Sequence, residues 1–260
     1  MTRTALITGA SQGSGLAIAR RFARQGYDVV MVARQEERLR SAAEEVAQFG
    51  HQVLAIPADV GKASEVAALV KKALNQYECI DVLINNAGFC LTGDMVDTTL
   101  EDWHQIMDTN LWGYVHTIHA LLPSFLEQGR GVIVNVGSFG GQMPLPHMTA
   151  YCTSKYAVTG LTHTLRLELA PQGIHVALVQ PGMINSDFLE RAVFRGNVEA
   201  QRAQMANLAS SAWVSQPDDI AEAVWDVVVH RKPELVVGPA QFVTEAYRLF
   251  PGLMQWAMQT

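Results

Sequence analysis

The stretch Thr8-Gly9-Ala10-Ser11-Gln12-Gly13-Ser14-Gly15 decides the fold, because it joins an apolar run at residues 5–7 to a helical pattern at residues 16–24. Glycines in a strand–turn–helix let the backbone approach a pyrophosphate, whose charge then meets the free N–H groups of the helix start. The spacing is GxxxGxG and differs from the usual GxGxxG. The turn is therefore predicted to bind a dinucleotide through Gly9, Ser11, Gln12, Gly13, Ser14 and Gly15.

The rest of the chain alternates short apolar runs with helical patterns. Strands are predicted at residues 5–7, 29–32, 53–56, 82–84, 132–136, 174–179 and 235–237. Helices are predicted at residues 16–24, 36–49, 64–77, 100–127, 151–170 and 217–230. Strands that are apolar throughout are typical of parallel sheets with helices on both faces. The pattern predicts an α/β, Rossmann-like, doubly wound parallel sheet of about seven strands, in a single domain spanning residues 1–260.

Two segments depart from the alternation. Residues 186–213 resemble a helical insertion, and the tail at residues 240–260 is an apolar helix interrupted by Pro251-Gly252. Each of the two segments is a candidate for a substrate lid, a subunit contact or a membrane-surface contact. Arg248 is the only basic residue of the tail, which makes it a weak ligand for anionic lipids.

Composition narrows the classes of protein that the chain can belong to. It has 260 residues, 49% of them hydrophobic, and a formal net charge of −6. No basic stripe that could bind nucleic acid is present, and no stretch reaches the roughly 18 apolar residues of a membrane-spanning helix. No signal peptide is recognisable, and the three cysteines show no paired framework, so a cytoplasmic location is expected. Only 17% of residues are charged, which is consistent with surface buried between subunits.

The end of the second predicted strand indicates which dinucleotide binds. An acidic residue about 20 residues after the glycine turn binds the ribose hydroxyls of NAD, but this chain has Ala33-Arg34 there. The forked, permanently charged donors of arginine suit a 2′-phosphate, so NADP(H) is favoured over NAD(H). Ser11 adds a hydroxyl donor, whereas Gln12 stands where a second basic residue would have strengthened the case. The alternative is that Arg34 is only a solvated residue at the start of a helix.

Three residues suggest acid–base chemistry. Ser138 follows a buried strand, Tyr151 lies thirteen residues later, and Lys155 follows Tyr151 by one helical turn. Residues at i and i+4 share one face of a helix, where an ammonium can stabilise a phenolate and lower the pKa of the tyrosine from about 10. The serine hydroxyl can then hold a substrate oxygen beside the phenol. An ordinary amphipathic helix would explain a Tyr-x-x-x-Lys spacing taken alone.

Taken together, these motifs make the chain resemble a short-chain dehydrogenase/reductase of the group with TGxxxGxG and YxxxK motifs. The resemblance covers roughly residues 4–238. Its motifs stand at residues 8–15, Asp59, Asn85-Asn86-Ala87-Gly88, Asn110, Ser138, Tyr151 with Lys155, and Pro181-Gly182 through Ser186.

The resemblance implies a role for each matching position. Tyr151 would be the general acid in reduction and the base in oxidation, with Ser138 orienting the substrate carbonyl. Lys155 would bind the nicotinamide ribose and lower the pKa of Tyr151, and Asn110 would hold a water that links Lys155 to a proton relay. The remaining implied cofactor contacts are Asp59 and Val60 at the adenine, Asn86, Ala87 and Gly88 along the cofactor, and Pro181, Gly182, Ile184 and Ser186 at the nicotinamide end.

Three departures from the family pattern stand out. Ser186 replaces the usual threonine and keeps its hydroxyl, whereas Ser14 replaces a customary isoleucine and alters the packing below the pyrophosphate. The C-terminus lacks the glycine-rich ending common in 3-oxoacyl-carrier-protein reductases and carries the apolar tail instead.

The loop before Tyr151 and the start of the insertion are expected to border the substrate. The candidate contacts besides Ser138 are Phe139, Met143, Leu145, His147, Met148, Met183 and Phe188. Packing within the loops is the alternative, and His147 is better explained as a solvent-facing residue than as a substrate contact. If these side chains do line a pocket, the substrate is bulky and apolar. His116 and His119 are three residues apart on a predicted helix but have no third ligand nearby in the sequence, so no metal site is expected.

The sequence thus predicts an NADP(H)-dependent oxidoreductase that interconverts a hydrophobic ketone and its secondary alcohol. The alternative within the class is a 3-oxoacyl-thioester reductase. A basic patch at the cleft mouth would support it, and the candidates in the insertion are Arg191, Arg195 and Arg202. A non-catalytic NADP-binding sensor or scaffold is a remote alternative, because such proteins usually lose the Tyr or Lys that this chain keeps. The resemblance also implies a homodimer or homotetramer built on the helices at residues 100–127 and 151–170.

Overall fold

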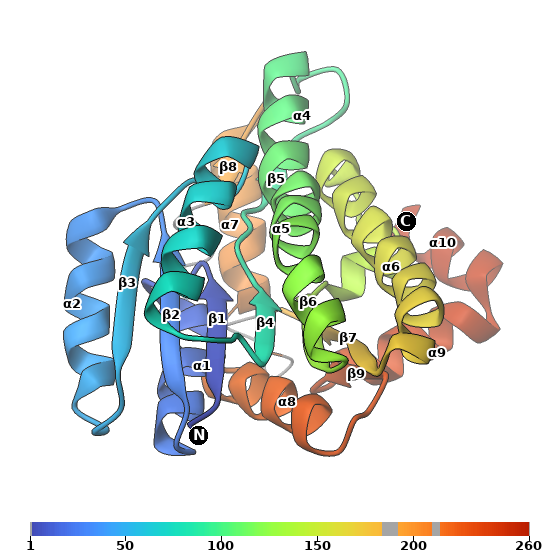
Figure 1. Cartoon of the computed structure of the whole chain (residues 1–260). Helices are drawn as coiled ribbons and strands as arrows, with labels where there is room; N and C mark the ends of the chain where they lie inside the picture. The colour runs from blue at the N-terminus through green and yellow to red at the C-terminus, as the bar shows by residue number, and fades with distance from the viewer. Residues whose placement is uncertain (1, 184–191, 210–213, 260) are drawn as a thin grey trace.

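A seven-stranded parallel sheet forms the centre of the protein (Figure 1). The computed structural model describes residues 2–183, 192–209 and 214–259. The strands lie in the order β3-β2-β1-β4-β6-β7-β9, and every pair of neighbours is parallel. Their bounds are β1 Thr4–Thr8, β2 Asp28–Ala33, β3 Val53–Pro57, β4 Val82–Asn85, β6 Gly131–Val136, β7 Ile174–Pro181 and β9 Glu234–Val237. The predicted doubly wound sheet of seven strands is confirmed.

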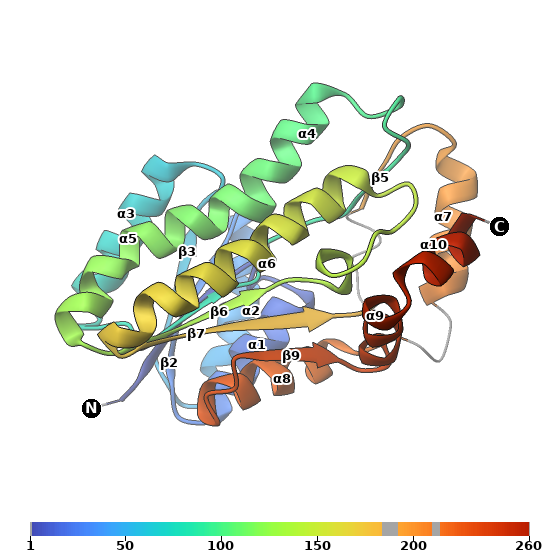
Figure 2. The ribbon, with the colours of Figure 1, turned by 90° about the vertical axis from the view of Figure 1, so that its right-hand side faces the viewer.

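Helices cover both faces of this sheet, as the apolar strands require. One face packs against α1 (Gly13–Arg24), α2 (Glu36–Ala47) and α8 (Pro217–Val229). The other face packs against α3 (Ala63–Gln76), α5 (Gly113–Gln128) and α6 (Thr149–Leu169). In Figure 2, α5 and α6 lie above the sheet and α1 and α8 lie below it. The strands are buried on both sides, which explains why their sequences do not alternate.

The prediction of one continuous helix at residues 100–127 is wrong, because the helix is interrupted. The structure divides it into α4 (Leu100–Met107), a five-residue π-helical turn η1 (Asp108–Trp112) and α5. The reason is tertiary packing on either side of the turn. Asn110 is fully buried and bonds to the backbone of Phe89, and Gly113 packs so closely on Val60 that a Cβ would lie 2.7 Å from Val60 Cγ2. Such π turns concentrate at functional sites.

The insertion contains a helix, as its sequence indicated, and half of a short strand pair that the periodicity did not predict. Strand β8 (Val193–Phe194) pairs in parallel with β5 (Leu91–Thr92) to form a separate two-stranded sheet. Helix α7 (Val198–Ala209) follows β8. Both strands have only two residues, which is too short for a hydrophobic period to be recognised.

The tail forms two helices, α9 (Ala240–Leu249) and α10 (Pro251–Gln259). The expected interruption is present but falls at Phe250, and Pro251 and Gly252 begin α10. Large apolar side chains of these helices and of Phe250 between them are exposed, namely Phe242, Leu249, Phe250, Leu253 and Trp256. None of the helices in the described part of the chain is long and apolar enough to cross a membrane.

Candidate active site

Two adjoining cavities open along the carboxyl ends of the strands. Both have walls made by Gly9, Gln12, Ala87, Gly88 and Phe89, so they meet where the glycine turn faces the segment after β4. β1 and β4 are neighbours in the sheet, and the strand order reverses between them. This reversal is the position at which doubly wound sheets bind their ligands.

The glycine turn is held tightly against the end of β4. Gly9 has a φ of +67°, and a Cβ there would lie 2.9 Å from Ala87 Cα. A Cβ on Gly15 would lie 2.1 Å from the carbonyl oxygen of Gly9, so no larger residue fits at either position. Thr8 Oγ1 accepts hydrogen bonds from the backbone N–H groups of Asn86 and Ala87, both at 3.0 Å. Because the turn is pinned in this way, it provides a fixed backbone cradle at the N-terminus of α1, as a pyrophosphate requires.

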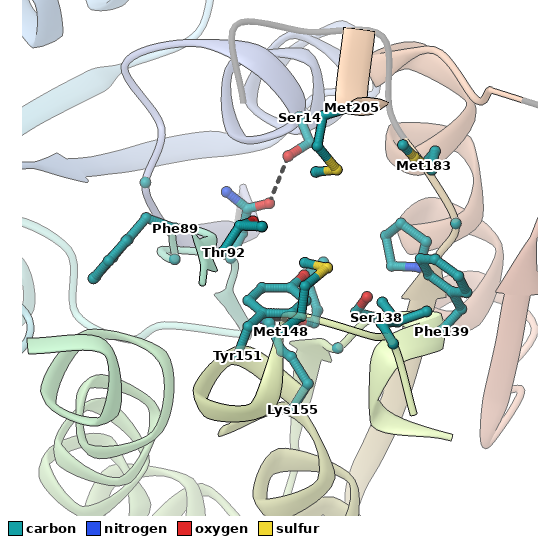
Figure 3. A pocket seen from close by; sticks show the side chains of 18 of the residues that line it. Ser14, Phe89, Thr92, Ser138, Phe139, Met148, Tyr151, Lys155, Met183 and Met205 are labelled. Atoms are coloured by element: carbon teal, nitrogen blue, oxygen red, sulfur yellow. Dashed lines mark hydrogen bonds between the residues drawn. The ribbon is translucent and has the colours of Figure 1, made fainter. Parts of the chain in front are cut away.

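Ser14, the departure from the family's isoleucine, has a defined contact. Its hydroxyl donates to Asn86 Oδ1 at 2.8 Å, and Asn86 Nδ2 in turn donates to the carbonyl oxygen of Thr8 at 3.1 Å. A hydrogen bond therefore replaces apolar packing at this position, and Figure 3 shows it on the pocket wall.

The second cavity contains the residues expected at the adenosine end. Its wall includes Ser11, Gln12, Arg34, Asp59 and Val60. It also includes Arg38, which the sequence analysis did not single out. Arg38, in the first turn of α2, donates from Nη1 to Gln12 Oε1. Arg34 precedes α2 and Arg38 lies in its first turn, so the available signal was a second arginine close to Arg34 at the start of the helix after β2.

Ser138, Tyr151 and Lys155 meet in the first cavity (Figure 3). Ser138 follows β6, where its hydroxyl accepts from the N–H of Gly140 at 3.1 Å. Tyr151 and Lys155 lie one turn apart near the start of α6, and both are buried. The ammonium of Lys155 donates to the carbonyl oxygen of Val136 at 3.1 Å and lies 5.5 Å from the centroid of the Tyr114 ring.

Burial sets the protonation of this group of side chains. It lowers the pKa of Lys155 to about 8. It also raises the pKa of Tyr151 above its usual range, with a further increase from the nearby Cys90 and an opposing effect from the hydrogen bond with Ser138. In the protein alone, desolvation thus outweighs stabilisation of the phenolate. A lower pKa of Tyr151 caused by Lys155 stays a prediction.

Asn110 is fully buried in the π turn and fixes the segment beside the catalytic candidates. Its Oδ1 accepts from the N–H of Phe89 at 3.0 Å, and its Nδ2 donates to the Phe89 carbonyl oxygen at 3.0 Å and to Ser154 Oγ at 3.1 Å. Because Ser154 is the residue before Lys155, Asn110 connects α6 to the cavity-lining segment between β4 and β5.

Most of the expected substrate contacts lie on the cavity wall. The residues placed there are Ser138, Phe139, Leu145, His147, Met148 and Met183, together with Pro181 and Gly182. Met143 is buried but does not line the cavity. Ile184, Ser186 and Phe188 lie outside the described residues. His147 pairs with Asp94 at 2.5 Å, and both side chains are exposed.

Seven further residues line this cavity that the sequence analysis missed, namely Phe89, Thr92, Val136, Gly137, Pro146, Gln201 and Met205. Gln201 and Met205 are four residues apart in α7, so they present to the cavity from one face of the helix. The i, i+4 spacing within the expected lid was the signal that could have identified them.

The arginines considered for a basic patch have other contacts. Arg195 forms a two-pronged ion pair with the buried Asp102, at 2.6 and 3.0 Å, and the hydrogen bonds from Arg195 lower the pKa of that carboxyl to about 2. The guanidinium of Arg202 lies 5.3 Å from the centroid of the Phe194 ring. Arg191 lies outside the described residues.

Within the described ranges, no three His, Cys, Asp or Glu side chains gather in a metal-binding arrangement. His116 instead contacts the carbonyl oxygen of Val60 through Nδ1, at 2.9 Å.

Comparison with known proteins agrees with this geometry. A family model described as short chain dehydrogenase matches residues 3–194. The 3-oxoacyl-[acyl-carrier-protein] reductase FabG of Staphylococcus aureus is 36% identical over 225 residues, which cover 86% of this chain and 89% of the relative.

Solved structures with the same fold hold different cofactors. A short chain dehydrogenase/reductase from Burkholderia phymatum in complex with NAD superposes with a TM-score of 0.89 at 25% identity, covering 97% of this chain and 95% of its own. A variant of actinorhodin polyketide ketoreductase with NADPH superposes with a TM-score of 0.79 at 31% identity, covering 90% and 95% of the two chains. The neighbours therefore support a nicotinamide cofactor of either kind.

The family match, the sheet and the cavity together identify the chain: it belongs to the short-chain dehydrogenase family and is an oxidoreductase that acts on CH–OH and C=O groups with a nicotinamide cofactor.

Proposed function

We propose that the protein is an NADP(H)-dependent carbonyl reductase that interconverts a hydrophobic ketone and its secondary alcohol. The observation that carries this proposal is the convergence of Ser138, Tyr151 and Lys155 in a cavity continuous with the glycine turn. The rest of the cavity is mainly apolar, with Phe89, Phe139, Leu145, Met148, Met183 and Met205 in its wall. An apolar wall with a few polar groups at one end suits a substrate whose polar atom is the reacting oxygen.

In the proposed mechanism, Tyr151 moves the proton and Ser138 holds the substrate oxygen. When bound, the cofactor supplies the hydride for reduction and accepts it in oxidation. Tyr151 donates its phenolic proton to the carbonyl oxygen during reduction and removes the hydroxyl proton in the reverse direction. Its burial keeps the phenol protonated before the reaction, which suits the role of an acid.

Lys155 and Asn110 support this proton transfer. We assign Lys155 to the nicotinamide ribose and to stabilisation of the Tyr151 phenolate. Its distance of 3.1 Å to the Val136 carbonyl oxygen fixes the ammonium between β6 and α6. Asn110 is assigned to a water that leads from Lys155 to solvent, and its own side chain is already bonded to Phe89 and Ser154.

The remaining cofactor contacts follow the two cavities. The pyrophosphate is assigned to the turn at Gly9, Ser11, Gln12, Gly13, Ser14 and Gly15, the adenine to Asp59 and Val60, and the nicotinamide half to Asn86, Ala87, Gly88, Pro181 and Gly182. We also assign the nicotinamide carboxamide to Ile184 and Ser186.

The preference for NADP(H) rests on two arginines. Arg34 and Arg38 both line the cavity at the adenosine end, and Arg38 bonds to Gln12 of the glycine turn. Arg38 thus supplies the second basic group that Gln12 itself does not. Two guanidinium groups favour a 2′-phosphate through charge and forked hydrogen bonds.

A second candidate is reduction of a 3-oxoacyl thioester, which the similarity to the Staphylococcus aureus reductase favours. A phosphopantetheine-bearing substrate needs basic groups at the cavity mouth. Arg195 and Arg202 already contact Asp102 and Phe194, so we place this candidate second.

The test is oxidation of NADPH, with NADH in parallel, across aliphatic, aromatic, steroidal and 3-oxoacyl-thioester carbonyls. The proposal expects turnover of apolar ketones with NADPH at a higher kcat/KM than with NADH. Turnover confined to the thioesters would move the second candidate to first place. NADPH binding without turnover of any carbonyl would contradict the proposal.

We further propose that the protein is a homodimer or homotetramer that buries the outer faces of α5 and α6. Trp112, Leu126, Tyr156 and Leu167 are large apolar side chains exposed on this side of the molecule. Sedimentation equilibrium gives the mass directly, and a monomer at micromolar concentration would contradict this proposal.

A further inference from the structure

Helix α7 brings one polar side chain to an otherwise apolar part of the cavity wall. Gln201 and Met205 both line the cavity, one helical turn apart. Figure 3 shows Met205 across the pocket from Tyr151 and Lys155, so α7 covers the side away from the reacting groups. Gln201 is nine-tenths buried, with a relative exposure of 9%. Buried amides are normally bonded at both the oxygen and the nitrogen.

One hydrogen bond determines which atom of the Gln201 carboxamide stays available. Its Nε2 donates to the carbonyl oxygen of Arg195 at 2.9 Å. A backbone carbonyl can only accept, so this position must hold the amide nitrogen and the oxygen must face away from it. Gln201 Oε1 is buried and has no hydrogen-bond partner in the described part of the protein. Gln201 is therefore an acceptor without a donor, at the edge of a ligand cavity.

The backbone that orients Gln201 is itself held firmly. Arg195 is ion-paired through two bonds with the buried Asp102, and its N–H donates to the carbonyl oxygen of Thr92 at 2.9 Å. The N–H of Gln201 donates to the Asn197 carbonyl oxygen at 3.1 Å, within the first turn of α7. The acceptor is thus held by both the helix and the β5–β8 pair.

Strand β5 connects the backbone around Gln201 to the cavity wall. Thr92, at the end of β5, lines the cavity. Arg195 connects Thr92 to Gln201, because its N–H donates to the Thr92 carbonyl oxygen and its own carbonyl oxygen accepts from Gln201 Nε2. Gln201 is therefore held next to a residue of the cavity wall.

We propose that Gln201 is a specificity residue that accepts a hydrogen bond from the substrate. The substrate class is a ketone with a hydroxyl or amide N–H donor separated from the carbonyl by an apolar segment. The inference rests on the proposed reductase function, since it places the reacting oxygen at Ser138 and Tyr151. A site built to bond a donor discriminates strongly against an analogue that lacks it, because the buried acceptor is then left unpaired.

Matched substrates test this directly. The first pair is a ketone with a para-hydroxyphenyl group two carbons from the carbonyl, and its para-methylphenyl counterpart. The second pair is a 3-oxobutanoyl thioester of N-acetylcysteamine, which carries an amide N–H, and the corresponding butyl thioester. The pairs distinguish a hydroxyl donor from an amide donor. Each is measured with NADPH on the wild type, on Gln201→Met and on Met205→Leu, which alters the same helix face without touching a hydrogen bond.

We expect the wild type to prefer the donor-bearing member of at least one pair by roughly 10- to 100-fold in kcat/KM. Gln201→Met should reduce that preference to within about threefold, through loss on the donor-bearing substrate alone. Met205→Leu should keep it. Equal use of both members of each pair by the wild type would overturn the proposal, as would a preference that survives in Gln201→Met.

A binding measurement separates this inference from the proposed function. Quenching of NADPH fluorescence gives the Kd of each ketone and thioester on Tyr151→Phe loaded with NADPH, where no turnover intervenes. A donor preference in Kd that disappears on adding Gln201→Met supports the role of Gln201 even if no substrate is turned over. Turnover without any donor preference in Kd or kcat/KM would support the reductase and overturn the role of Gln201.

Discussion

The buried ammonium of Lys155 donates a hydrogen bond to the carbonyl oxygen of Val136 at 3.1 Å. Val136 ends β6, and Ser138 follows it by two residues. The lysine on α6 is therefore attached to the strand end that presents the serine. This contact holds the catalytic candidates from two elements in one arrangement, and it encloses a charge whose pKa burial lowers to about 8.

This burial predicts a pH dependence of stability. Between the folded pKa of about 8 and the unfolded value near 10.5, the unfolded chain binds more protons at Lys155 than the folded one. The free energy of unfolding should therefore rise from pH 8 to pH 9.5, with this residue contributing about 1–2 kcal/mol. Urea titrations of the wild type and Lys155→Met measure the difference. A rise of equal size in Lys155→Met would contradict the assignment. Well below pH 8, Lys155 is protonated in both the folded and the unfolded wild type, so it should add no pH dependence there.

Asn110 is expected to matter for both stability and turnover. Asn110→Ala leaves the N–H and C=O of Phe89 and the hydroxyl of Ser154 without their present partner. Unpaired buried groups of this kind cost about 1–3 kcal/mol each before water or rearrangement compensates. Denaturant unfolding should show a loss in that range, and kcat should fall with little change in the Kd for NADPH. A variant with wild-type stability would show that these bonds contribute nothing.

The two arginines at the adenosine end predict a change of cofactor preference. Arg34→Ala and Arg38→Ala should each raise the KM for NADPH about tenfold while leaving the KM for NADH within about twofold, because only NADPH carries the 2′-phosphate. Arg40→Ala is the matched control, since Arg40 is exposed on α2, as Arg38 is, and does not line the cavity. An equal increase in the KM for NADPH and for NADH would mean that these arginines do not bind the 2′-phosphate.

The ion pair between Arg195 and Asp102 is expected to stabilise the folded protein at β8. Arg195→Ala removes both bonds to a buried carboxyl, although Arg195 itself is partly exposed and solvent screens the pair. A loss of about 1–2 kcal/mol is expected at pH 7. The folded pKa of Asp102, about 2, lies below the unfolded value near 3.8, so this contribution persists above pH 4 and is lost as the pH falls towards 2. Thermal unfolding of the wild type and Arg195→Ala at pH 7 and pH 3 measures this contribution. A loss of stability in Arg195→Ala that is as large at pH 3 as at pH 7 would contradict the prediction.

The central sheet and the catalytic candidates could be predicted because they depend on local patterns. The seven strands of the central sheet are mainly apolar runs, and Tyr151 and Lys155 share a helix face by spacing alone. The π turn at Asn110 could not be predicted, because it depends on bonds to Phe89, which lies 21 residues away in the chain. The same holds for Arg38 at Gln12 and for the orientation of Gln201, each determined by a partner from another element. Residue types predict chemistry, whereas long-range contacts decide which atoms remain available for it.

The measurement that tests the central claim most directly is the turnover of a ketone by Tyr151→Phe. The substitution removes one hydroxyl from a buried ring and keeps its packing, so the protein should fold and bind NADPH with nearly unchanged Kd. If Tyr151 supplies the proton, kcat should fall by at least a hundredfold. Tight NADPH binding together with kcat close to that of the wild type would contradict the mechanism.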